Sequence, residues 1–195
     1  MALFSTAYWA PRSYYRLAEQ ASLVQIEQYE RYQKQSYRNR CVILSANGPL
    51  VLTVPILRPH ACVIRDARID YSKPWRQIHR RAIEAAYRSS AYFQEYSGEI
   101  GTIYQSNTPF LFDLNIKIWE LSQTLLGVSF PWALTHQCTS LTDNTDDYRA
   151  AIHPKAKRKP DVLALDPYFQ IFNNKFGFFP DLSILDLIFN EGTLR

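Results

Sequence analysis

Apolar residues follow two different spacings near the start of the chain, and the change between them predicts a fold class. Residues 3–8 form a short apolar run typical of a buried strand, and residues 23–26 form a second run. Between the runs, Pro11 suits the first turn of a helix, and apolar residues recur at helical spacing from Tyr14 to Ala21. A strand, a helix and a strand this close together predict a βαβ unit with parallel strands.

A β-hairpin around Asn47 and Gly48 is the clearest local pattern in the sequence. Asn-Gly supplies the two residues with positive φ that a type I′ turn needs. Apolar and β-branched residues flank the pair at 41–46 and 50–57. Residues 63–71 alternate between apolar and polar positions, which predicts a further extended segment.

Helical periodicity accounts for much of the remaining chain. The segments that show it are residues 72–88, 90–104, 109–126 and 182–190. Thr108 is the expected cap of the third helix and Asp181 that of the fourth. The other expected elements are strands at 133–141 and 168–172 and a loop at 141–160 with a basic run at 155–159. The pattern predicts a single α/β domain over residues 1–195, with a βαβ start, a mixed sheet, the hairpin and several flanking helices.

Composition narrows the class of protein. Hydrophobic residues make up 47% of the chain and charged residues 21%, so the chain can bury a core. The three cysteines are far apart, and no histidine pair has ligand spacing, so we expect neither a disulfide framework nor a metal site. A glycine-rich phosphate loop is missing from the sequence, and we expect no cofactor.

The charge and the ends of the chain bear on its partners and its compartment. The net charge of +4 is mild and dispersed, which suits a small anionic or sugar-containing ligand better than a nucleic acid. The sequence shows neither a signal-peptide pattern nor an apolar run of about 18 residues. We therefore expect a cytoplasmic protein without a membrane span.

Residues 28–40 form a polar stretch, with four cations and no aliphatic residue, between two segments that have the pattern of buried strands. Because the stretch follows the second strand, a βαβ unit would place it at the C-terminal edge of the sheet, where ligands bind. One interpretation is a solvated connector, since the spacing itself has low specificity. The other is a pocket for a phosphate or carboxylate, lined by three cations and two amides: Lys34, Arg38, Arg40, Gln33 and Asn39.

His79 is the candidate general base, because the pKa of histidine lies near neutrality. It shares a helical stripe with Trp75 and Tyr87, whose rings could stack on a sugar or base. The alternative is that His79 packs in the core and makes one hydrogen bond. The neighbouring stripe, which begins at Ile78, is the one expected to be buried.

Two groups of charged residues have a functional and a structural interpretation. Asp66 or Asp70 could steer His79 or order the cationic cluster, and the alternative is ion pairing with the neighbouring Arg68, which contributes little when exposed. Arg80 and Glu84 follow at i, i+4 spacing, which is typical of a solvated ion-pair face.

Several motifs together resemble the WbqC-like family. They are residues 32–40, the hairpin with 52–55, residues 66–70, Trp75, His79, 83–84 and Tyr87, then 92–93, 112–115 and 180–192. The resemblance covers nearly the whole chain, and its first and last motifs are long. Residues 147–155 are similar to the shorter branch of the family found in Bacteroidetes-type bacteria, which lacks the long helical insertion of other members.

Members of this family are found in gene clusters for O-antigen and other surface polysaccharides. The resemblance implies a transferase that acts on a nucleotide-activated or other anionic sugar intermediate, by acyl, aminoacyl, glycosyl or nucleotidyl transfer. The alternative is a non-catalytic binding or scaffold protein that holds a partner enzyme of the same pathway. RNA binding through residues 34–40 and 155–159 is a weaker alternative, since no RNA-module signature is present.

Overall fold

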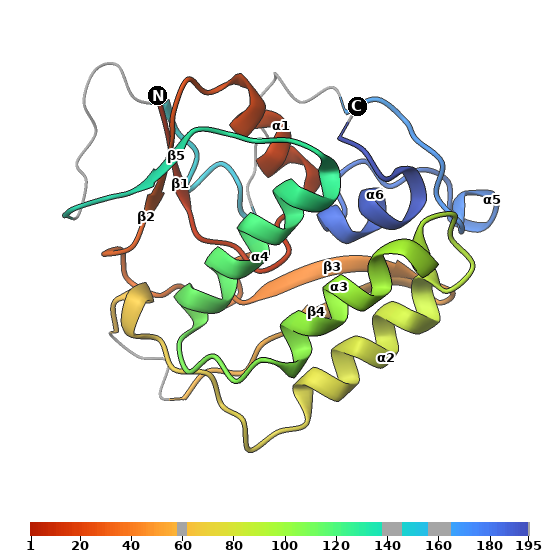
Figure 1. The fold of residues 1–195 in the computed structure, drawn as a ribbon, viewed down its shortest axis with the longest axis horizontal. Helices are drawn as coiled ribbons and strands as arrows, with labels where there is room; N and C mark the ends of the chain where they lie inside the picture. Colours follow the sequence, from red (N-terminus) through yellow and green to blue (C-terminus); the bar gives the residue numbers. More distant parts are fainter. Residues whose placement is uncertain (58–61, 138–145, 156–164, 195) are drawn as a thin grey trace.

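The computed structural model describes residues 1–57, 62–137, 146–155 and 165–194 (Figure 1). Strand β1 (Ala2–Ser5) pairs in parallel with β2 (Val24–Glu27), and α1 (Arg12–Gln20) lies between them in sequence. This confirms the predicted βαβ start. All four residues of β1 are buried, as expected for a parallel strand that is covered on both faces.

Two short strands complete the parallel sheet. Strand β5 (Trp132–Leu134) pairs with β2, and β6 (Asp146–Asp147) pairs with β1. The strand order is β5-β2-β1-β6. Strand β6 lies in the segment that was expected to be a loop. The sequence did not predict this strand, because only two of its residues pair and so short a strand leaves no alternating pattern. The basic run at 155–159 lies outside the described residues, except for Lys155.

The predicted hairpin is confirmed, and it forms a sheet of its own instead of joining the parallel strands in one mixed sheet. Strands β3 (Arg40–Ser45) and β4 (Gly48–Thr53) pair so that Ser45 lies opposite Gly48. Gly48 has a φ of +102°, whereas Asn47 is not among the residues with positive φ, so the turn is not type I′. The Ser45 hydroxyl instead accepts from Asn47 N and donates to the Gly48 carbonyl, which closes the turn.

Four further helices pack around the hairpin and the sheet (Figure 1). They are α2 (Trp75–Tyr87), α3 (Phe93–Gln105), α4 (Leu111–Leu126) and α6 (Ile184–Glu191). Helix α6 is buried from its first residue to Asn190, which makes it a central core helix. On α2 the stripe through Trp75 and His79 is buried and Ile78 is 56% exposed, so the expectation for Ile78 was wrong. The aromatic stripe faces the core because it offers more area to bury.

Two helix caps differ from the predicted ones. Helix α4 follows Phe110, not Thr108. The hydroxyl of Ser183 caps α6 by accepting from Leu185 N. Asp181 instead accepts a hydrogen bond of 3.0 Å from the backbone N–H of Ser13, in the first turn of α1. The residue therefore caps a helix that is distant in sequence.

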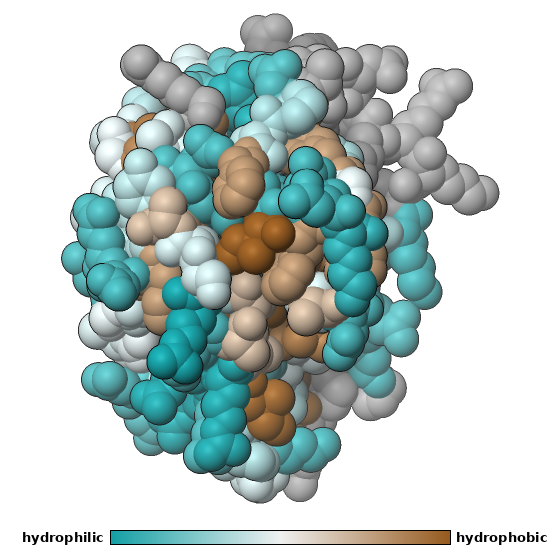
Figure 2. All heavy atoms as spheres, turned by 90° about the vertical axis from the view of Figure 1, so that its right-hand side faces the viewer, coloured by the Kyte–Doolittle hydropathy of each residue, from teal (hydrophilic) through white to brown (hydrophobic). Residues whose placement is uncertain are grey.

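Two further segments depart from the expected extended conformation. A short 3₁₀ helix, η1 (Ile64–Asp66), interrupts residues 63–71. No strand forms at 168–172, where the chain is irregular and leads into α5 (Asn173–Phe176). Figure 2 shows the face that carries α5, on which hydrophobic side chains gather within a hydrophilic surround, and Phe169 is 64% exposed. In the part of the chain that the structure describes, no helix has the length and hydropathy needed to cross a membrane.

Candidate functional site

The C-terminal edge of the parallel sheet brings together polar residues from four strands. Ser5 ends β1 and Glu27 ends β2, and the two residues lie opposite each other in the register. Strands β2 and β5 lie on one side of β1, and β6 lies on the other. The strand order therefore reverses beside β1, which is where open α/β sheets bind ligands.

Glu27 is a fully buried carboxylate that joins three strands at this edge. Its Oε1 accepts hydrogen bonds of 2.8 Å from Tyr29 N and 2.9 Å from the Thr135 hydroxyl, just beyond β5. Its Oε2 lies 3.6 Å from Nη1 of Arg149, which follows β6 and also pairs with Asp147 at 2.8 Å. These contacts make Glu27 a structural anchor for the edge.

Arg38 lies beside this anchor and is almost completely buried. Its Nε donates to Glu30 Oε1 at 2.7 Å, and its Nη2 donates to Glu30 Oε2 at 2.5 Å and to the Ser5 hydroxyl at 2.7 Å. Gln33 accepts a longer hydrogen bond of 3.3 Å from Nη1. Since Glu30 neutralises the Arg38 guanidinium, Arg38 orders the polar stretch more than it adds net positive charge.

Arg40 differs from Arg38 in its hydrogen-bond partners. Its Nε and Nη2 are buried, and no hydrogen-bond acceptor in the described part of the chain reaches them. An arginine stays charged in proteins, so a buried guanidinium without partners is costly unless an acceptor binds to it. Nε and Nη2 form one edge of the guanidinium, the edge that holds two oxygens of a phosphate or carboxylate.

The electrostatic effects on two neighbours show that Arg40 and Arg38 act on the same space. Burial raises the pKa of Tyr32 to about 12, and both guanidinium groups oppose that shift. Burial lowers the pKa of His153, and Arg38, Arg40 and Lys155 lower it further. Burial and these cationic neighbours therefore both favour the neutral imidazole of His153.

A small cavity of ≈ 10 Å³ lies at the same edge, with room for about one water molecule. Its wall includes Ser5 and Thr6 from the end of β1, Arg38 from the polar stretch, and Tyr148 and Ile152 from the segment after β6. The segment after β6 therefore lies over the end of β1. The side chains of Tyr148 and Ile152 close the cavity on that side.

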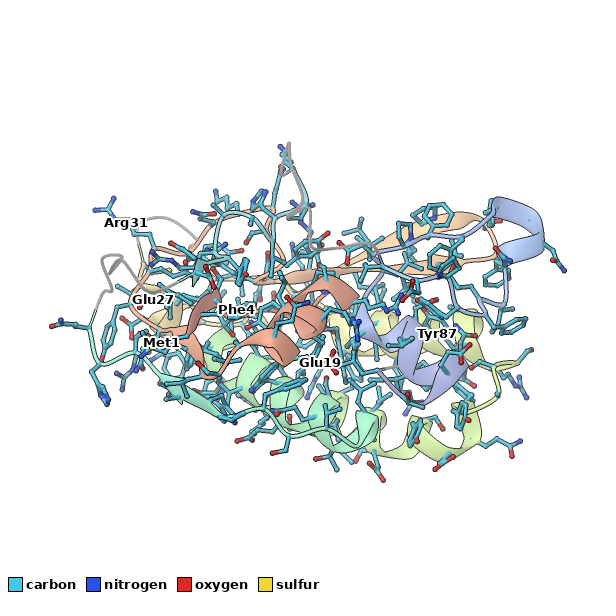
Figure 3. All side chains as sticks on the ribbon, turned by 90° about the horizontal axis from the view of Figure 1, so that it is seen from above. Met1, Phe4, Glu19, Glu27, Arg31 and Tyr87 are labelled. Atoms are coloured by element: carbon cyan, nitrogen blue, oxygen red, sulfur yellow. The ribbon has the colours of Figure 1, made fainter. Side chains whose placement is uncertain are left out.

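The other predicted members of the anion pocket lie apart from this cavity wall. The side chains of Gln33 and Lys34 are exposed. Asn39 is buried, and its amide donates to the Val54 carbonyl at 2.9 Å, which ties the polar stretch to the residue that follows β4. Figure 3 shows Glu27 within the ribbon at the end of the molecule that carries Phe4, and Arg31 pointing away from the body.

His79 is buried on α2 and belongs to a hydrogen-bonded chain of aromatic residues. Its Nδ1 lies 2.8 Å from the Tyr8 hydroxyl, which lies 2.9 Å from the Tyr104 hydroxyl. Trp9 Nε1 donates to Tyr104 at 3.0 Å. Burial lowers the pKa of His79 to about 4, and a hydrogen bond with the Thr53 backbone opposes the shift. The imidazole is therefore neutral at pH 7, with Nδ1 placed to accept from Tyr8.

The remaining predicted site residues lie around other parts of α2. Asp66 is exposed, and Asp70 accepts hydrogen bonds from the backbone and hydroxyl of Ser72, an arrangement that caps the turn before α2. Trp75 is buried with its ring edge toward His79. Tyr87 is buried and stacks on Phe189, near the other end of the molecule from Glu27 (Figure 3).

Comparison with known proteins assigns the family. The model of the WbqC-like protein family matches residues 7–160. The chain belongs to the WbqC-like family. The uncharacterized protein Rv1507c of Mycobacterium tuberculosis (strain ATCC 25618 / H37Rv) is 29% identical over 190 residues, which cover 83% of this chain and 80% of that protein. No solved structure gives a significant match.

The sequence interpretation of this WbqC-like chain did not single out four residues of the candidate site: Ser5, Glu27, Glu30 and His153. Ser5 and Glu27 end the two strands of the βαβ unit, and that position was a usable signal. Glu30 is the one carboxylate of the polar stretch, so the sequence could predict that it pairs with an arginine, although not with which one. His153 offered no signal, because its approach to Arg38 and Arg40 depends on how the chain returns through β6.

Proposed function

We propose that this WbqC-like chain is a transferase of bacterial surface-polysaccharide biosynthesis that binds an anionic sugar intermediate at the C-terminal edge of its parallel sheet. Family membership supports a role in polysaccharide biosynthesis, because the family's name is associated with that pathway. The cations of the site support a negatively charged ligand. The proposal covers acyl, aminoacyl, glycosyl and nucleotidyl transfer alike, because an anionic group is common to their intermediates.

The observation that carries the proposal is the buried, unpartnered edge of Arg40. Arg38 and Arg149 already have carboxylate partners, whereas the half-buried Arg40 has a buried guanidinium edge for which the described residues supply no acceptor. A phosphate or carboxylate satisfies Nε and Nη2 together. His153, whose neutral form is favoured by burial and by its cationic neighbours, supplies a second polar group beside the anion.

A ligand larger than water needs more room than the cavity beside Arg38 offers. In our proposal the side chains of Tyr148 and Ile152 move aside, so that the sugar lies over the end of β1. His79 enters the proposal as a positioning residue. It binds the hydroxyl of Tyr8, and the backbone N–H of Tyr8 donates to the Tyr37 carbonyl in the polar stretch at 2.8 Å.

Isothermal titration with sugar 1-phosphates and nucleotide sugars, with the matching free sugars for comparison, tests the proposal. We expect the phosphorylated compounds to bind and Arg40→Gln to weaken their binding at least about tenfold, the effect of one charge-assisted contact. Arg31→Gln is the matched control, because Arg31 belongs to the same polar stretch and is exposed. Equal binding of free and phosphorylated sugars, or unchanged binding by Arg40→Gln, would refute the anion site.

One observation favours the second candidate, a scaffold protein that holds a partner enzyme of the pathway. Phe169 is 64% exposed a few residues before α5, and Figure 2 shows that hydrophobic side chains gather on the face that carries α5. Exposed apolar patches of this kind mark interaction surfaces. If polysaccharide synthesis in cells is lost with Phe169→Ser and retained with Arg40→Gln, the scaffold function replaces the transferase.

A further inference from the structure

A groove is lined by residues of α2 and α3, helices that take no part in the parallel sheet. Figure 1 shows these two helices side by side. It consists of two adjoining hollows of ≈ 310 Å³ and ≈ 630 Å³. Arg80, Tyr104 and Gln105 line both hollows, so the hollows adjoin along these residues, and we call the pair the helix groove. Its size is in the range of small-molecule sites.

The two ends of the helix groove differ in chemistry. The smaller hollow has an apolar wall that includes Ile83, Phe93 and Phe189, and its lining also includes Arg80, Glu84 and Ser97. The larger hollow is lined by three cations: Lys73, Arg76 and Arg80. This arrangement matches a ligand with an apolar body and an anionic group.

One of the three cations, Lys73, interacts electrostatically with Asp70, whereas Arg76 and Arg80 form no salt bridge between described residues. The sequence predicts an ion pair between Arg80 and Glu84, but neither residue takes part in the salt bridges between described residues. Arg76 is held in place, since its guanidinium lies 4.9 Å from the centre of the Tyr71 ring and donates to the Ser106 carbonyl at 3.2 Å. An ordered cation of this kind loses little freedom when an anion binds.

Two glycines on α3 provide an independent indication of a ligand. Gly98 and Gly101 line the groove, and a Cβ added to either would meet nothing within 4 Å. Glycine in a helix interior costs about 1 kcal/mol relative to alanine. Neither close packing nor positive φ requires these two glycines. Their missing side chains leave the wall of the groove open for the close approach of another molecule.

Tyr104 forms a rigid wall where the two hollows meet. It is buried, and its hydroxyl is bound by Tyr8 at 2.9 Å and Trp9 at 3.0 Å, so the ring is fixed from behind. The ring therefore presents a preformed surface to a ligand instead of rotating into the space.

We propose that the helix groove is a binding site for a small amphipathic anion. The flat apolar body of the ligand lies in the smaller hollow against α3, where Gly98 and Gly101 leave room, and its anionic group lies at Arg76 and Arg80. The site uses none of the residues of the sheet edge, so it stands or falls independently of the function proposed above.

Binding of two dyes that differ in one charge tests this site. The anionic probe is 8-anilinonaphthalene-1-sulfonate, and N-phenyl-1-naphthylamine has the same rings without the sulfonate. We expect both dyes to bind the native protein, measured by fluorescence titration. Arg80→Ala should weaken the anionic dye about tenfold and leave the neutral dye within about twofold, because it removes one charge-assisted contact. Arg81→Ala is the matched control, since Arg81 is exposed on the same helix outside the groove.

A second variant tests the position of the apolar body. Gly101→Leu should weaken both dyes at least about tenfold, because the new side chain fills the smaller hollow, while leucine also favours a helix. Thermal unfolding of this variant at or above the wild-type midpoint shows that the fold is retained. Wild-type dye binding by folded Gly101→Leu, or an equal loss with Arg81→Ala and Arg80→Ala, would overturn the proposal.

Discussion

The carboxylate of Glu27 and the guanidinium of Arg149 face each other across the C-terminal edge of the sheet, with 3.6 Å between Oε2 and Nη1. The contact links the end of β2 to the segment after β6, a strand that pairs through only two residues. Since this segment also carries His153, the position of the imidazole beside Arg38 and Arg40 depends on a buried charge contact more than on strand pairing.

Arg149→Met should destabilise the protein by about 1–2 kcal/mol, because a fully buried carboxylate loses a cation that is itself partly exposed. The free energy of unfolding in urea measures the loss. Arg16→Met is the control, since Arg16 pairs with Glu19 on the surface and should change stability by less than about 0.5 kcal/mol. Equal effects of the two substitutions would show that Arg149 contributes as a surface residue only.

Arg38→Met should cost about 3–5 kcal/mol, because it leaves Glu30 buried without its partner. The double variant Arg38→Met/Glu30→Met should recover part of that loss, since neither charge then remains buried. Urea unfolding of the single and double variants forms a double-mutant cycle that isolates the pair. A single-variant loss under about 1 kcal/mol would mean that water already satisfies Glu30.

The stability of the protein should fall as the pH drops from about 6.5 to about 4, owing to His79. Burial lowers the pKa of His79 from 6.5 to about 4 in the folded chain, so the unfolded chain binds the proton first. The contribution of this group is complete above pH 6.5 and declines by about 3 kcal/mol through that window.

Unfolding free energies of the wild type and His79→Asn across this range measure the effect. Their difference should change with pH between 6.5 and 4 and be constant at higher pH, because the other titrating groups are common to both chains. A difference that stays constant over the whole range would show that His79 does not titrate as a buried imidazole.

Asp181→Ala should destabilise the protein by about 1 kcal/mol through α1, not through the adjacent α6. The carboxylate accepts the hydrogen bond of the Ser13 N–H, so amide hydrogen exchange at Ser13 should speed up. Asp113→Ala provides the comparison, because Asp113 is exposed in the first turn of α4. If exchange instead rises at Leu185, Asp181 supports α6 after all.

The predicted elements with a strong local pattern are present in the structure. The βαβ start, the hairpin and helices α2, α3, α4 and α6 each repeat a spacing over several residues, and that repetition determines their type. Short elements were missed for the opposite reason. β6 has two residues and α5 has four, which are too few for a period to be recognised.

The sequence by itself determined the fold class, the order of the main elements and the position of a cationic polar stretch after the second strand. Tertiary structure decided which charges in that stretch have partners. Glu30 neutralises Arg38, whereas none of the described residues supplies an acceptor to the Nε–Nη2 edge of Arg40. Tertiary structure also decided that Arg80 faces a groove instead of pairing with Glu84. The physical reason is that spacing along the chain sets local conformation, whereas the partners and burial of a charge depend on segments that meet only when the chain folds.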